Sequence, residues 1–191
     1  FPTRRSSDLW FRIGLAVKLA FVFLLSPAIQ QQWFLPFMIH IYESPSLTPW
    51  TSFLLSGGTY VSFPYGPIML LSHLPMTFCG WLLDQLFSSH YFVGVGFRIG
   101  LLVADLFILL FLLQQFNSIW KKIITFYWLS PLVLFITYWH GQTDLIPVAL
   151  FFISIGYLKR KNQKLGGIFL ALSVAAKHSM LIGVPFLFIY L

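Results

Sequence analysis

Long apolar segments alternate with short polar ones along most of the chain. A helix needs about 20 apolar residues to cross the hydrocarbon core of a bilayer, and several segments approach this length. The apolar segments are 10–28, 68–87, 92–113, 123–139, 145–158 and 165–176, and a last one begins at 180. A polar, aromatic and proline-rich stretch, 30–67, separates the first two. The pattern predicts an all-α, polytopic transmembrane bundle with a long first outer loop.

The basic residues predict how this bundle is oriented. Short cytoplasmic loops carry Lys and Arg, and here these residues gather at Lys121-Lys122 and within 159–164. Two apolar segments lie between the clusters, so both clusters can face the cytoplasm. Arg12 favours a cytoplasmic start, which places the long loop and the 140–144 turn outside.

The number of crossings then sets a condition on one segment. Because the loop is outside and Lys121 is cytoplasmic, the chain must cross the membrane an odd number of times between them. Two apolar segments, 68–87 and 92–113, lie there. We expect 68–87 not to cross, because a histidine, a proline and Asp84 interrupt it. It would be a membrane-hugging or re-entrant helix packed against the others. The alternative is that it crosses and that Lys121 departs from the rule.

Composition excludes a soluble domain. Apolar residues make up 58% of the 191 residues and charged residues 9%, whereas a soluble domain carries roughly 25% charged residues. The net charge of +7 comes from short clusters between apolar segments, so it indicates topology and a lipid bilayer as partner, with no nucleic acid. The single cysteine, Cys79, excludes an intramolecular disulfide and a cysteine-based metal site.

Neither end of the sequence is typical of a complete protein. Residues 1–9, FPTRRSSDL, share no character with the apolar segment after them and resemble a translated sequencing-adapter read, so we set them aside. At the other end the sequence stops at Leu191, inside an apolar segment. We therefore expect 10–191 to be the N-terminal part of one membrane domain whose C-terminal part is missing.

The densest polar cluster near the membrane is the turn His140-Gly141-Gln142-Thr143-Asp144. Gly141 permits a tight turn, and the other four side chains offer donors, acceptors and a carboxylate. This favours a binding or catalytic role. The alternative is a solvated connector in which Asp144 caps the following helix.

Four cationic or acidic positions within or beside apolar segments offer further chemistry. Lys177, followed by His178, either reaches the interface as a helix-end lysine or faces an anionic leaving group. Arg98 and Asp105 share one helical face. Because ionisable groups in a membrane are costly, Arg98 either pairs with Asp105 or binds a lipid phosphate, which suits a guanidinium.

Two more charged residues complete the candidates. Glu43 is the only acid of the long outer loop, with His40 three residues before it, and is either catalytic or an exposed bystander. Lys18, within the first apolar segment, either reaches the interface or lines a groove.

Four features succeed one another in a fixed order. They are a span followed by a long outer loop; the loop ending 63–67 (Phe-Pro-Tyr-Gly-Pro); Ser130-Pro131 in the span that leads to the 140–144 turn; and a glycine-rich helix, 166–177, that ends in Ala-Lys before a segment with Pro185. In this order they resemble the GT-C type of membrane glycosyltransferase, which uses polyprenyl-phosphate sugars. Its Tyr-Pro-Pro-like element precedes a membrane-hugging helix, as 63–67 precedes 68–87.

The resemblance implies hexosyl or pentosyl transfer, as in mannosyltransferases. A polyprenyl-phosphate sugar would donate to a glycan, lipid or protein acceptor on the outer (periplasmic or lumenal) face of a bacterial inner membrane. The implied site residues are Asp144 or Glu43 as catalytic base, Arg98 or Lys177 at the phosphate, and His140, Gln142, His178 and Tyr65 as further substrate-binding residues. The family usually has an Asp in the first outer loop, which this loop lacks, so the base stays open between the two carboxylates. A divalent metal is possible in the family, and no cofactor is certain.

Two other classes of function stay open. A transporter or flippase for a lipid-linked substrate would also use Arg98 and Asp105 within the membrane. Transporters often have internal repeats, whereas this sequence shows none and gathers its polar groups at one face, which favours an enzyme. A non-catalytic assembly subunit would tolerate replacement of Glu43, Asp144 and Lys177.

Overall fold

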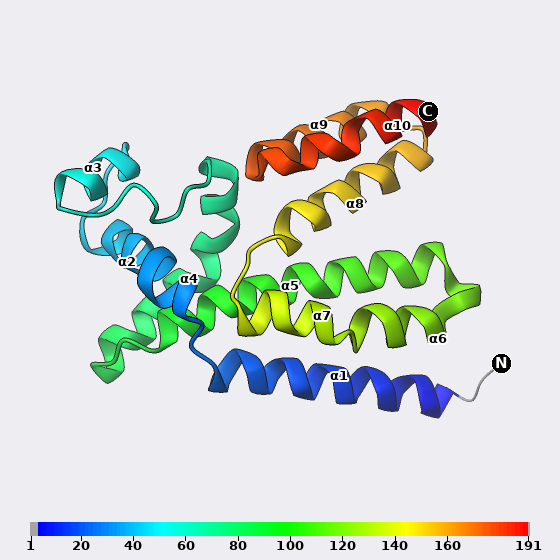
Figure 1. Ribbon diagram of the computed structural model, residues 1–191, viewed down its shortest axis with the longest axis horizontal. Helices are drawn as coiled ribbons and strands as arrows, with labels where there is room; N and C mark the ends of the chain where they lie inside the picture. Colours follow the sequence, from blue (N-terminus) through cyan, green and yellow to red (C-terminus); the bar gives the residue numbers. More distant parts are fainter. Residues whose placement is uncertain (1–3, 191) are drawn as a thin grey trace.

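The computed structural model describes residues 4–190, and this range consists of helices and connecting loops without a strand (Figure 1). The expected all-α fold is confirmed. Its helices, in chain order, are α1 (Arg4–Leu24), α2 (Leu35–Glu43), α3 (Pro49–Leu55), α4 (Pro67–Phe87), α5 (Phe92–Gln115), α6 (Trp120–Ile123), α7 (Pro131–Val133), α8 (Leu145–Lys159), α9 (Gln163–Ala176) and α10 (Val184–Tyr190). Wider π-helical turns cover Gln30–Phe34, Ile124–Trp128 and Leu134–Trp139, and 3-10 turns cover Asn117–Ile119 and His178–Gly183.

The segment expected to be foreign, 1–9, falls partly outside this range. Residues 1–3 are not among the described residues, and the remainder forms the first turns of α1.

The long helices run in similar directions and define two ends of the molecule. In Figure 1, α1, α5, α8, α9 and α10 lie along the horizontal axis, together with the segment that contains α6 and α7. The connection from α5 to α6 and the connection from α8 to α9 lie at the right. We call this the basic end, because Lys121 lies in α6 and Lys159, Arg160 and Lys161 lie at the end of α8 and directly after it. The α2–α4 region and the α9–α10 junction lie toward the left, which we call the opposite end. The two basic clusters thus lie at the same end of the molecule.

Two helical segments in the described range are long and apolar enough to cross a membrane. They are Phe92–Gln115, which is α5, and Asn117–Trp139, which contains α6 and α7. They lie antiparallel and meet at the basic end (Figure 1). Pro131 interrupts the second segment, and the Ser130 side chain accepts a hydrogen bond from the Val133 N–H (3.5 Å) at the new start.

The predicted long loop is more structured than expected. Stretch 30–67 contains a π-helical turn, α2 and α3, because short apolar runs within it pack on α4 and α5. Segment 68–87 matches α4 closely, and Figure 1 shows α4 crossing the opposite end obliquely rather than lying along the bundle.

Glycines allow α4 and α5 to pack backbone against backbone. A Cβ at Gly80 would lie 2.2 Å from the Phe92 carbonyl oxygen, and one at Gly96 would lie 2.1 Å from the Met76 carbonyl oxygen. Small residues permit such close approach between helices. This contact fixes α4 across the first half of α5.

Asp84 lies in the apolar helix α4 because its carboxylate binds the start of the next helix. Its carboxylate accepts hydrogen bonds from the Ser89 hydroxyl and from three backbone N–H groups: that of Tyr91, directly before α5 (2.9 Å), and those of Phe92 and Val93, which begin α5 (2.8 Å each). The N-terminus of a helix leaves such donors unsatisfied and favours a negative charge. The residue that interrupts α4 therefore caps α5.

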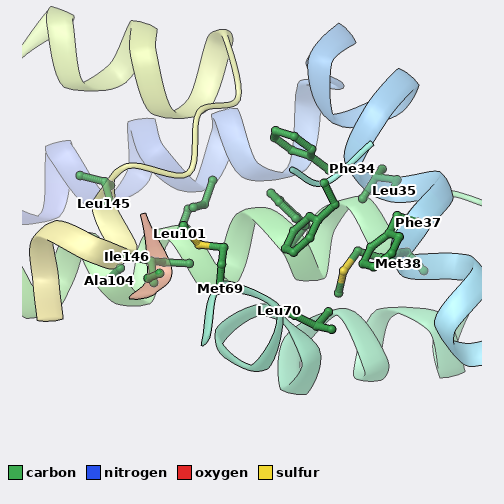
Figure 2. Close-up of a cluster of buried hydrophobic side chains, with 14 of the residues drawn as sticks. Phe34, Leu35, Phe37, Met38, Met69, Leu70, Leu101, Ala104, Leu145 and Ile146 are labelled. Atoms are coloured by element: carbon green, nitrogen blue, oxygen red, sulfur yellow. The ribbon is translucent and has the colours of Figure 1, made fainter. Parts of the chain in front are cut away.

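An aromatic core joins the opposite end to the bundle. Phe34 and Phe37 lie beside Met38, Met69 and α5 in Figure 2, and all of these side chains are buried. Leu145 and Ile146, at the start of α8, extend the same core (Figure 2). The core thus fixes the start of α8 relative to α2 and α4, and with it the turn that precedes α8.

Candidate functional site

Three residues from separate segments meet toward the opposite end. Asp144, directly before α8, forms an ion pair with Lys177, directly after α9. The Lys177 Nζ also lies 5.9 Å from the ring centroid of Tyr65. The Asp144 side chain is 43% exposed and that of Lys177 26% exposed, so both can be reached by a ligand. Each of the three was a sequence candidate.

Helix packing brings the pair together. The Ser173 hydroxyl of α9 donates to the Pro147 carbonyl of α8 (2.8 Å), and the Ser154 hydroxyl of α8 donates to the Gly166 carbonyl of α9 (2.7 Å). These buried bonds hold the two helices antiparallel, so the start of α8 faces the end of α9. Asp144 makes no side-chain cap bond to α8, so the capping alternative is wrong.

The loop ending 63–67 is held against the end of α9. Phe63 is buried with a positive φ of 51°, and its ring stacks on Phe37 with centroids 5.2 Å apart. A Cβ at Gly66 would lie 3.1 Å from the Ala175 carbonyl oxygen. Tyr65, between these two anchors, is therefore placed beside Lys177.

The remaining residues of the 140–144 turn differ in exposure. Gly141 has a φ of 89°, which a glycine adopts without strain, and it lies against Pro27 and Gln30. His140 is exposed and Gln142 is half-buried. The Thr143 hydroxyl is buried and has no partner among the described residues. His178, beyond Lys177, is exposed.

Glu43 lies apart from this group. It is the exposed last residue of α2, and in the described part of the chain no hydrogen bond or ion pair joins it to another candidate. His40 and Glu43 both lie in α2, and His40 contacts the Ser52 hydroxyl (3.0 Å) rather than Glu43.

Arg98, in α5, is fully buried. Its Nε donates to the Val22 carbonyl (2.7 Å) and its Nη1 donates to the Gln30 side-chain oxygen (3.4 Å). Gln30 in turn donates to the Gly141 carbonyl (3.3 Å). Arg98 therefore contacts the candidate turn through Gln30, and the alternative of an ion pair with Asp105 is wrong.

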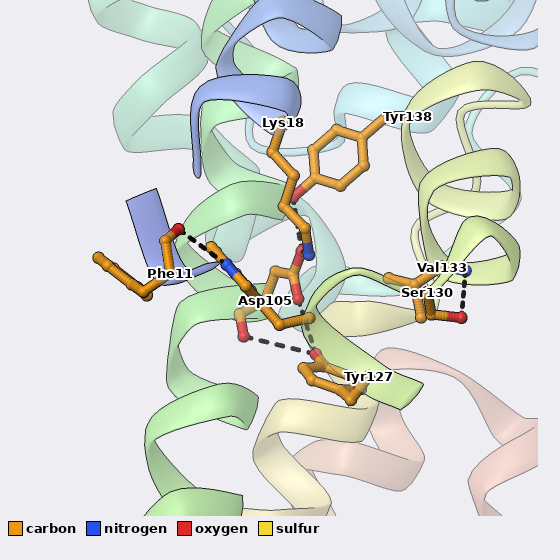
Figure 3. Close-up of polar contacts among 8 residues, drawn as sticks. Phe11, Lys18, Asp105, Tyr127, Ser130, Val133 and Tyr138 are labelled. Atoms are coloured by element: carbon orange, nitrogen blue, oxygen red, sulfur yellow. Dashed lines mark hydrogen bonds and ion pairs between the residues drawn. The ribbon is translucent and has the colours of Figure 1, made fainter. Parts of the chain in front are cut away.

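Asp105 instead belongs to a buried cluster around Lys18 (Figure 3). The Lys18 ammonium pairs with the Asp105 carboxylate, and both side chains have 0% exposure. Tyr127 and Tyr138 each donate a hydrogen bond of 2.8 Å to the same carboxylate, and the Lys18 Nζ lies 3.9 Å from the Trp128 ring centroid. The sequence reasoning missed this pair. The sequence nevertheless indicated it, because Lys18 and Asp105 are ionisable residues in separate apolar segments and each requires a partner.

The residues near Asp144 do not fit a divalent metal. A metal site needs several convergent ligands, and the described residues contain no group of three or more His, Cys, Asp or Glu side chains that could hold one. The nearest charged neighbour of Asp144 is the cation Lys177, which competes with a metal for the carboxylate.

Comparison with known proteins gave no relative: no protein-family model, no curated protein and no solved structure matches the chain.

Proposed function

We propose that the chain is a polytopic membrane glycosyltransferase segment that moves a sugar from a polyprenyl-phosphate donor to an acceptor. In this proposal the basic end faces the cytoplasm, and Asp144, Lys177 and Tyr65 face the outer side, in a bacterial inner membrane. α1, α5, the Asn117–Trp139 segment and the α8–α10 region cross, and α4 lies in the outer interface.

The observation that carries the proposal is the Asp144–Lys177 pair beside Tyr65. Three short motifs, far apart in the sequence, each supply one of these residues. An acid, a cation and an aromatic ring at a partly open position suit a phosphorylated sugar. The two candidate spans and the shared basic end support the membrane setting.

The pair also suggests an order of events. The donor phosphate is a diester with one negative charge, and it draws Lys177 away from Asp144 because this charge grows toward two as the bond to the sugar breaks. The freed carboxylate accepts the proton of the acceptor hydroxyl. The hydroxyl oxygen bonds to the anomeric carbon as the bond from that carbon to the phosphate oxygen breaks. The lipid phosphate leaves with the bonding electrons, and Lys177 stabilises its charge.

The other candidates take supporting roles. His140 and Gln142, beside Asp144 on the turn, contact the sugar or acceptor, and His178 lies next to the phosphate-binding Lys177. Arg98 orients the turn through Gln30 and, because it is fully buried, holds no ligand directly. Glu43 is the second candidate base, and Asp144 is favoured because, among the described residues, it is the carboxylate that pairs with Lys177.

The test is sugar transfer in membranes from a panel of polyprenyl-phosphate sugars. We expect Asp144→Asn to lower the rate about 10²–10⁴-fold, as loss of a general base does, and Lys177→Ala about 10²-fold or more. Glu43→Gln keeps most of the activity. Lys164→Ala, a lysine at the basic end, serves as the matched control for Lys177→Ala.

A charge swap separates catalysis from structure. The double variant Asp144→Lys/Lys177→Asp rebuilds the ion pair with its charges exchanged. If the pair only fixes α8 to α9, the swap restores activity. We expect the swapped protein to be folded and inactive; full transfer by the swapped protein or by Asp144→Asn contradicts the assignment.

A further inference from the structure

A cavity of about 460 Å³ opens at the basic end, away from the Asp144 group. Its lining comes from the early turns of α1 and from the first part of the Asn117–Trp139 segment. Its lining residues are Trp10, Trp120, Lys121, Ile124, Thr125 and Leu129. A cavity of this volume holds a headgroup and the adjoining part of an acyl chain.

The lining has the chemistry of a phospholipid rather than of a water-soluble ligand. Tryptophan side chains favour the lipid–water interface, where the ring lies in the apolar region and the N–H meets the headgroups. Lys121 supplies a cation at the same level, and Thr125 supplies a hydroxyl. Ile124 and Leu129 form the apolar part that an acyl chain would cover.

A second, smaller cavity repeats this chemistry between neighbouring helices. It measures about 180 Å³ and is lined by Phe111 of α5 and by Ile153, Gly156, Tyr157 and Arg160 of the α8 region. Again a cation and an aromatic ring meet apolar side chains, and Arg160 belongs to a basic turn of the basic end. Basic cavities between transmembrane helices on this side are suited to anionic headgroups.

From these two cavities we infer that the basic end binds anionic phospholipid, with Lys121 holding the headgroup phosphate and the two tryptophans flanking the glycerol region. Arg160 holds a second, weaker site. The inference rests on the membrane topology proposed above and not on the transferase activity. The transfer assay can therefore fail while this binding is observed.

The experiment uses the tryptophans themselves as the probe. The full chain is placed in phosphatidylcholine nanodiscs that contain increasing amounts of brominated phosphatidylglycerol, or of brominated phosphatidylcholine, and tryptophan fluorescence quenching is measured. A Trp10→Phe/Trp120→Phe variant identifies the quenching that comes from the cavity. Lys121→Gln removes the proposed headgroup ligand, and because Lys121 is exposed this change leaves the fold intact.

We expect brominated phosphatidylglycerol to quench the cavity tryptophans at a concentration about fivefold lower than brominated phosphatidylcholine, the preference that one basic residue provides. Lys121→Gln removes this preference, and Lys164→Gln, at the same end but outside both cavities, keeps it. Equal quenching by the two lipids overturns the inference. So does an equal loss in Lys164→Gln, which indicates diffuse attraction, or competition by free glycerol phosphate, which indicates a site for a soluble anion.

Discussion

The buried ion pair of Lys18 and Asp105 predicts a large and specific loss of stability. Both side chains have 0% exposure, and the carboxylate has two further donors, Tyr127 and Tyr138, each at 2.8 Å. Lys18→Met keeps the apolar stem but leaves a buried carboxylate with neutral donors alone. Because removing one member of a buried pair costs about 3–5 kcal/mol, we expect this loss in the free energy of unfolding for Lys18→Met and for Asp105→Asn.

The double variant separates the contribution of the ion pair from that of the contacts around it. Lys18→Met/Asp105→Asn contains no buried charge, and Asn still offers an oxygen to one tyrosine hydroxyl. We expect a loss of about 1–3 kcal/mol, far below the sum of the single losses. The assay is reversible SDS unfolding in mixed micelles, followed by tryptophan fluorescence. If the double loss equals that sum, the coupling energy is zero and the ion pair contributes nothing.

Two other contacts give predictions of the same kind. Burial opposes ionisation of Asp84, but the hydrogen bonds from Ser89 and from the α5 backbone outweigh it and lower its pKa. A lowered folded-state pKa gives stability that is present above the unfolded value of about 3.9 and lost as pH falls through the folded pKa. Asp84→Asn should cost about 1–2 kcal/mol at neutral pH and abolish this pH dependence; a parent-like pH profile in the variant contradicts the cap. Gly80→Ala, whose Cβ meets a carbonyl at 2.2 Å, should cost about 1–3 kcal/mol, and Gly167→Ala, with nothing within 4 Å, should be neutral or slightly stabilising; equal stabilities refute the close helix contact.

The helix positions can be read from the sequence because membrane-length apolar runs leave few alternatives. Segments 68–87 and 145–158 agree with α4 and α8 within one or two residues at each end. Stretch 30–67 was predicted as loop because it is polar, aromatic and rich in proline. Short apolar runs within it nevertheless form helices, because they pack on α4 and α5.

The side-chain partners were less accessible to sequence reasoning. Asp144 and Lys177 were chosen for separate roles, and only the antiparallel packing of α8 and α9 shows that they touch. Arg98 was matched with Asp105 because they share a helix face. Arg98 instead donates a hydrogen bond to the backbone carbonyl of Val22, and no sequence pattern reveals a carbonyl as a partner. Lys18 was the better choice for Asp105, since it too lay unpaired in an apolar segment.

The 87-residue separation of Lys18 from Asp105 has a consequence for biogenesis. On the proposed topology, α1 meets the insertion machinery before its counter-ion has been synthesised. At about 5–20 residues per second, Asp105 emerges some 4–17 s later. During that interval a lysine at mid-helix disfavours insertion by about 2.5–3.5 kcal/mol. α1 on its own would therefore enter the membrane incompletely, and the arrival of α5 would complete its insertion, so that a nascent chain truncated before Asp105 leaves α1 accessible to water-soluble labelling reagents.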